Sequence, residues 1–89
     1  MKVKARILSV SREEGLYKAT LEIVYDGESL TAQVDHLPRK PVRVRAIDQG
    51  DRVRLDITDV EGMGIASFII HKSHLEKGCI DCRSLLLPA

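Results

Sequence analysis

The sequence is poor in the residues that build large cores and elaborate chemistry. Among its 89 residues it has no tryptophan, three aromatic residues and two cysteines. A core with so few rings must consist mainly of Val, Ile and Leu, and this composition favours β-strands. Two cysteines cannot form the disulfide framework of a small secreted domain. The close spacing of Cys79 and Cys82 is more typical of a thiol or metal role in a reducing compartment.

The sequence also lacks a dominant charge and a long apolar run. Its 14 basic and 13 acidic residues leave a formal net charge of +1, so net charge alone favours neither nucleic acid nor an anionic membrane as a partner. Charged and apolar residues alternate over residues 1–10, so we expect no signal peptide, and no segment approaches the length of a bilayer span. These features predict a soluble, cytoplasmic protein that does not enter a membrane.

Motifs of catalysis are missing as well. The sequence contains no nucleophile elbow, no phosphate-binding glycine loop and no His-Glu zinc motif. Asp35 and His36 are adjacent, but neighbouring residues in a strand point to opposite faces, so we expect both side chains to lie apart in solvent. The sequence therefore predicts a protein that is not an enzyme.

What the sequence does contain is alternation of apolar and polar residues, which is typical of half-buried strands. In the segment 52–58, for example, Val53, Leu55 and Ile57 alternate with charged residues. The predicted strands are about 2–9, 18–25, 28–36, 42–46, 52–58 and 65–70, with 79–87 as a last strand or a docked tail.

Turn residues separate these segments. Asp26-Gly27 predicts a two-residue hairpin, because a type I′ turn needs positive φ at both central positions. Pro38 and Pro41 cannot donate to a ladder, which predicts a loop or an edge crossing. Ser73 precedes an acidic residue by three positions, the capping-box spacing, which predicts a short helical turn near 73–77.

Five or six short strands without repeats or linkers indicate one all-β domain over residues 1–89. At this size we expect a small closed barrel of five to six strands, because closure removes exposed strand edges.

A resemblance supports this fold. Over about residues 3–57 the chain resembles the small OB-type barrels of the TOBE and Mop kind. The resemblance is carried by the first strand, the Asp26-Gly27 hairpin, Leu30-Thr31-Ala32 and the run 50–55, which reads Gly-Asp-Arg-Val-Arg-Leu. It implies an OB-like barrel in which the first strand lies beside the strand at 52–58. The oxyanion-binding residues of those modules have no match here.

Basic residues gather on the outward positions of the predicted strands. In an OB-like barrel they would merge into one stripe that neutralises phosphates and gives salt-dependent affinity for nucleic acid. Alternatively, exposed strand faces carry Lys and Arg simply because these residues protect edges. The candidate nucleic-acid-binding residues are Lys2, Lys4, Arg6, Arg39, Arg43, Arg45, Arg52 and Arg54.

The region near the C-terminus suggests a different function. His71, His74, Cys79 and Cys82 form a complete tetrahedral donor set for zinc, and each pair has a two-residue spacer. Against this, only four residues separate the two pairs, far fewer than in most structural zinc sites. In the alternative interpretation the thiols pack as small apolar groups and no cofactor is bound. The second functional hypothesis is therefore a zinc-stabilised protein-interaction module.

Three consecutive leucines, Leu85 to Leu87, precede Pro88 near the C-terminus. A free terminus is rarely so apolar. We therefore expect this tail to dock on its own domain, on a second copy of the chain or on a protein partner.

Overall fold

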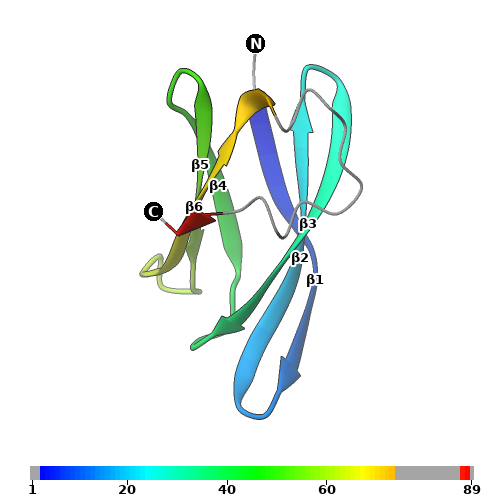
Figure 1. Ribbon diagram of the computed structural model, residues 1–89. Helices are drawn as coiled ribbons and strands as arrows, with labels where there is room; N and C mark the ends of the chain where they lie inside the picture. The colour runs from blue at the N-terminus through cyan, green and yellow to red at the C-terminus, as the bar shows by residue number, and fades with distance from the viewer. Residues whose placement is uncertain (1–2, 74–86, 89) are drawn as a thin grey trace.

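The computed structural model describes residues 3–73 and 87–88, which form seven β-strands and, directly after the sixth, two helical residues, Lys72 and Ser73. One antiparallel sheet has the order β1-β2-β3, and a second has the order β4-β5-β6-β7 (Figure 1). The strands are β1 (Val3–Glu13), β2 (Leu16–Tyr25), β3 (Glu28–Leu37), β4 (Arg43–Asp48), β5 (Arg52–Thr58), β6 (Gly64–His71) and β7 (Leu87–Pro88). No helix among the described residues is long and apolar enough to cross a membrane.

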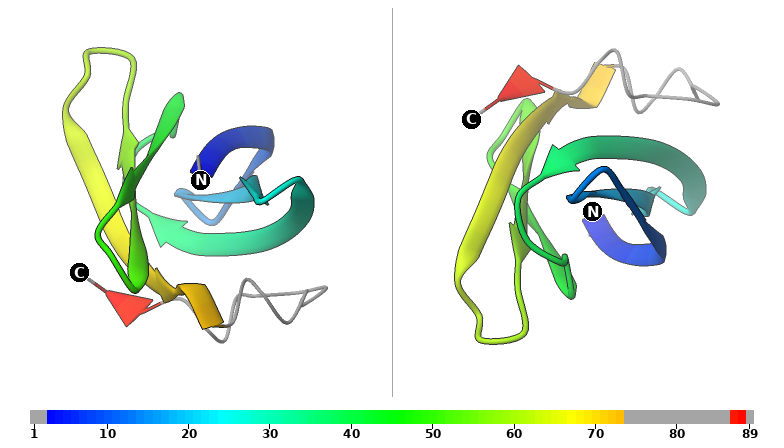
Figure 2. Two further views of the ribbon diagram at one scale, coloured as in Figure 1. Left: turned by 90° about the horizontal axis from the view of Figure 1, so that it is seen from above. Right: turned by 90° about the horizontal axis from the view of Figure 1, so that it is seen from below.

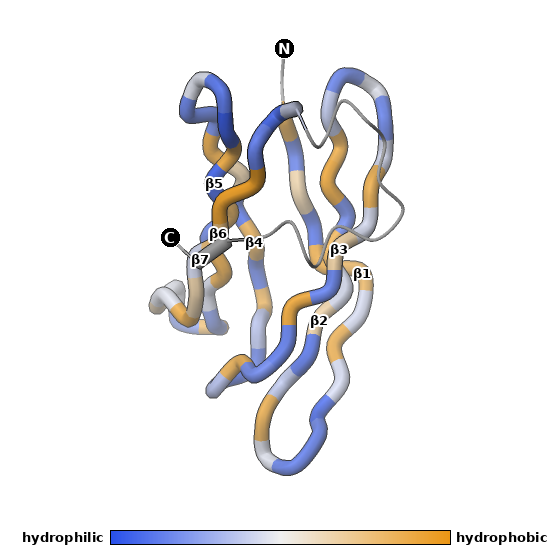
Figure 3. The backbone as a smooth tube through the Cα atoms, in the orientation of Figure 1, coloured by the Kyte–Doolittle hydropathy of each residue, from blue (hydrophilic) through white to orange (hydrophobic). Residues whose placement is uncertain are grey.

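The two sheets enclose a common core. Figure 2 shows β1–β3 as a strongly curled layer beside the layer of β4–β6. Apolar residues alternate with polar ones along the strands (Figure 3), and the apolar side chains that face the other sheet are buried. The fully buried members include Leu21 and Ile23 of the first sheet and Leu55 and Ile57 of the second, and they belong to a single apolar cluster.

Two-residue turns build both hairpins of the first sheet. Tyr25 pairs with Glu28, so Asp26 and Gly27 form the turn, with φ of 51° and 80°. These values fit a type I′ turn and confirm the predicted hairpin. Glu14 and Gly15 form an equivalent turn between β1 and β2, with φ of 51° and 82°.

Two irregularities interrupt the ladders of the first sheet. Leu8 is an extra residue in β1, where the register shifts between Ile7 and Ser9. In β3 the chain has two residues, Asp35 and His36, opposite one residue of β2. Such bulges bend the strand that carries the extra residue, and His36 accordingly has a positive φ of 58°.

The predicted closed, OB-like barrel is wrong. The strands form two separate sheets, and β1 lies near β4 without a ladder between them in the described part of the chain. The segment 38–42 connects β3 to β4, which are edge strands of different sheets, and its two prolines have no N–H to donate to a ladder. Pro41 is fully buried where the chain passes between the sheets.

The remaining predicted elements lie mostly where the structure gives no description. Lys72 and Ser73, directly after β6, are helical, and the rest of the helical turn expected at 73–77 falls outside the described residues. The strand or tail expected at 79–87 is described only at its end, where Leu87 pairs with Ile69 of β6. This end of the tail therefore pairs with its own domain.

Candidate functional site

The predicted basic stripe is divided between two sheets. Lys4 and Arg6 lie on β1, whereas Arg52 and Arg54 lie on β5, and these strands belong to different sheets. The expectation that β1 and β5 are neighbours is therefore wrong, because it rested on barrel closure. Lys2 lies outside the described residues.

Two of the predicted residues form hydrogen bonds and ion pairs within the domain. Arg6 Nε donates to Glu22 Oε1 at 2.8 Å, across the ladder between β1 and β2. The hydrogen bond from Ser29, followed by that from Arg6, lowers the pKa of Glu22. Arg39 donates to the carbonyl oxygen of Gly64 at 2.8 Å and lies 3.6 Å from Asp59, which ties the segment after β3 to the β5–β6 turn.

The other four arginines share the outer face of the second sheet. Val44, Leu55 and Ile57 are buried in the core, so the residues that alternate with them along β4 and β5 face away from it. Arg43, Arg45 and Arg52 are exposed there, and Arg54 is half-buried. We call this surface the arginine face: Arg43, Arg45, Arg52 and Arg54.

A single carboxylate lies among these arginines. Asp56 accepts hydrogen bonds from Arg54 Nε at 2.8 Å and from Ser67 Oγ at 2.7 Å. The Ser67 hydrogen bond lowers the pKa of Asp56 most, and Arg54 and the more distant charge of Arg45 lower it further. Asp56 thus stays ionised and offsets one of the four positive charges, which leaves the outer face of β4 and β5 with a clear positive excess.

Apolar side chains flank the centre of the arginine face. Ile47 of β4 and Ile69 of β6 are the direct cross-strand neighbours of Arg54. Both isoleucines are half-buried on the outer side of the sheet, in the same row as the guanidinium. The face therefore combines positive charge with an apolar centre.

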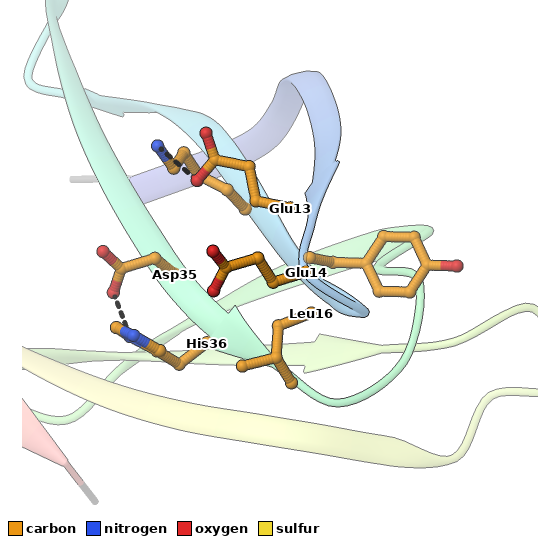
Figure 4. A pocket seen from close by; sticks show the side chains of 7 residues that line it. Glu13, Glu14, Leu16, Asp35 and His36 are labelled. Atoms are coloured by element: carbon orange, nitrogen blue, oxygen red, sulfur yellow. Dashed lines mark hydrogen bonds and ion pairs between the residues drawn. The ribbon is translucent and has the colours of Figure 1, made fainter.

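A pocket of about 470 Å³ lies between the β1–β2 turn and the bulge of β3. Figure 4 shows the side chain of Glu14 extending toward the part of β3 that carries Asp35 and His36. His36 Nδ1 lies 3.1 Å from Asp35 Oδ1, although neighbouring residues of a regular strand point to opposite faces. The bulge produces this contact, because positive φ at His36 turns the backbone between the two side chains.

The described residues around this acidic pocket hold neither a group that could bind a metal ion nor a hydroxyl or thiol nucleophile beside the histidine. Among the residues that the structure describes, no group of three or more His, Cys, Asp and Glu residues has an arrangement that could hold a metal ion. The described residues that line the pocket contain no Ser, Thr or Cys nucleophile beside His36. Glu13, at its rim, is 3.5 Å from Lys18. The residues that line the pocket come from the β1–β2 turn with its flanking residues and from the bulge of β3.

The predicted zinc ligands are only partly described. His71 is the last residue of β6, where it pairs with Arg52 of β5. His74, Cys79 and Cys82 lie outside the described residues. The zinc hypothesis therefore stays a prediction.

No family model matches this chain, and comparison with curated proteins and with solved structures found no match either. The resemblance of residues 3–57 to TOBE and Mop modules consequently stays an untested prediction, without the closed barrel that it implied.

Proposed function

We propose that this protein is a non-enzymatic module that binds nucleic acid through the arginine face. The observation that supports this function is the concentration of four arginines and one carboxylate, Asp56, on the outer face of β4 and β5. Strand geometry fixes all four on one side of a sheet. Of the other predicted cations that the structure describes, Lys4 and Arg6 lie on β1 of the first sheet, and Arg39 lies beside Asp59.

Arginine suits this role chemically. The guanidinium presents a planar fork of donors that matches the oxygens of a phosphate and stays charged at all physiological pH values. Contacts of this kind position a nucleic acid without reading its sequence, and they release counterions. The module therefore binds with little sequence preference and with strong dependence on salt. A cytoplasmic location, as expected from the sequence, agrees with such a function.

The test compares two matched double variants. Arg43→Gln/Arg45→Gln removes two cations spaced two residues apart on the outer face of β4. Lys4→Gln/Arg6→Gln removes the same charge with the same spacing from β1, on the other sheet. Binding to a fluorescent oligonucleotide of mixed sequence is measured by anisotropy at several salt concentrations, after circular dichroism has shown that each variant is folded.

The β4 variant should lose affinity, and its slope of log K against log salt should become shallower by about 1.4. This value corresponds to two lost phosphate contacts, each of which contributes about 0.7 to the slope for a single strand. The β1 variant should retain most of the affinity and the slope. Equal losses in both variants would indicate a diffuse charge effect and contradict the proposal. If the wild-type protein does not bind at low salt, the proposal is wrong.

A further inference from the structure

The register of the second sheet arranges the arginine face in four successive rows. On the outer face, Arg43 pairs with Thr58, Arg45 pairs with Asp56, and Arg54 pairs with Ile47. Arg52 precedes Arg54 by two residues on β5 and so occupies the next row. Each row thus holds one arginine, in the order Arg43, Arg45, Arg54, Arg52, along a diagonal from β4 to β5.

The spacing of these rows matches the repeat of a nucleic-acid strand. Two residues of an antiparallel strand advance about 6.8 Å, so the four rows span about 20 Å. Two residues contain six backbone bonds, and one nucleotide of a sugar-phosphate chain also contains six. An extended single strand laid along the rows therefore presents about one phosphate to each arginine.

A double helix fits this surface poorly. Its major groove is about 12 Å wide and admits an α-helix or a two-stranded ribbon. The second sheet has four strands, spaced about 4.8 Å apart, and is broader than such a ribbon. A duplex is also stiff over many turns, whereas a single strand can follow the twist of the sheet from Arg43 to Arg52.

The third row differs from the other three in a way that suits a base. The Arg54 guanidinium lies over the sheet toward the neighbouring row, because its Nε donates to Asp56 and a terminal nitrogen lies 3.5 Å from Ser67 Oγ. Its side chain remains 42% exposed, and its charge is balanced by Asp56. The planar guanidinium of Arg54 thus lies between two apolar side chains, Ile47 and Ile69. Bases of single-stranded nucleic acids stack on surfaces of this kind.

We propose that the arginine face selects single-stranded over double-stranded nucleic acid, with a site of about four nucleotides. Arg43, Arg45 and Arg52 contact phosphates, and one base stacks on Arg54 between the two isoleucines. This inference rests on the proposed function and adds to it the class of nucleic acid, the length of the site and a separate role for Arg54.

Four probes of known composition test it by fluorescence anisotropy with the full chain. They are oligothymidylates of two to eight nucleotides, an eight-nucleotide strand without bases, a duplex and a mixed-sequence single strand. Affinity should rise with length up to about four nucleotides. For longer strands it should increase only because the four-nucleotide site can bind in more than one position along the strand. The duplex and the strand without bases should each bind at least about fivefold more weakly than the oligothymidylate of equal length.

Arg54→Lys examines the stacking role, because lysine keeps the charge and the pairing with Asp56 but has no planar group. This variant should lose the preference for oligothymidylate over the strand without bases, and the slope of log K against log salt should not change. Arg52→Lys should retain both the preference and the slope. Ile47→Thr provides a second variant that preserves the β-branched shape of the strand and should also reduce the preference.

The outcomes separate the two proposals. If no probe binds at low salt, the proposed function itself fails. If the duplex and the strand without bases bind as tightly as oligothymidylate, the nucleic-acid function stands and the single-strand inference is overturned. An unchanged preference for bases in both Arg54→Lys and Ile47→Thr would likewise overturn the stacking role.

Discussion

Three residues other than glycine have positive φ in the part of the chain that the structure describes, and this conformation arises in two ways. Glu14 and Asp26 each precede a glycine in a two-residue turn, where the type I′ geometry requires this conformation. His36 adopts it inside β3, where the ladder gains an extra residue. The left-handed region costs a residue with a Cβ about 1 to 2 kcal/mol. His36 is therefore a strained and exposed position that contributes no side chain to the core.

Replacing His36 by glycine should stabilise the protein. Glycine relieves the left-handed strain, although part of the gain is offset by the greater freedom of the unfolded chain, so we expect about 0.5 to 1 kcal/mol. The lost pairing with Asp35 matters little, because the His36 side chain is 81% exposed. Urea denaturation measures the change. His36→Ala is the control, since it removes the ring and keeps the Cβ, and an equal gain in both variants would show that the backbone is not the cause.

At the scale of elements, β6 lies between β5 and β7 in the second sheet. It pairs with β5 along its whole length and with β7 near its middle. Its apolar residues face both sides of the sheet: Phe68 and Ile70 pack in or against the core, and Ile69 lies on the arginine face. At its end, Lys72 bonds to Asp48 at 2.8 Å, which raises the pKa of Lys72 and lowers that of Asp48.

The zinc hypothesis belongs to the segment that follows β6. If His71, His74, Cys79 and Cys82 bind zinc, the purified protein should contain about one metal per chain by elemental analysis. Cys79→Ser should then cost far more than the roughly 1 kcal/mol of an ordinary substitution, because metal binding contributes directly to folding. Chelation should lower the stability of the wild type and leave the Cys79→Ser variant unchanged. Metal-free protein whose stability is insensitive to chelator would rule this function out.

For the whole molecule, the decisive feature is that two open sheets share one core. Leu21 of the first sheet and Leu55 of the second are both fully buried in the same apolar cluster. Neither sheet can bury its apolar face without the other. The sheets should therefore fold and unfold together, although backbone pairing does not connect them in the described part of the chain.

Leu21→Ala and Leu55→Ala should each reduce the free energy of unfolding by about 2 to 5 kcal/mol, because a cavity replaces a buried side chain in either sheet. Both variants should keep a single unfolding transition in urea, with the same midpoint by circular dichroism and by tyrosine fluorescence. Separate midpoints in either variant would show that the sheets are independent units and would contradict the shared core. Gln33→Ala, at an exposed position of β3, is the control and should change stability little.

The sequence by itself determined the local structure. Alternation over two residues and the Asp26-Gly27 turn depend only on neighbouring residues, and β5 has the bounds that its pattern predicts, Arg52–Thr58. The high strand content of this small domain is confirmed for the same reason. Alternation also assigned Arg43, Arg45, Arg52 and Arg54 correctly to outward positions.

Only the tertiary structure decided which strands pair and which basic side chains are already bound to partners within the domain. Strand pairing between distant segments depends on the path of the loops, so alternation could not show that the chain forms two sheets instead of a closed barrel. The partners of Arg6 and Arg39 lie 16 and 25 residues away in the sequence. The four rows of arginines likewise depend on the register of β4 against β5, which the packed core sets because a shift of one residue would turn its apolar side chains outward.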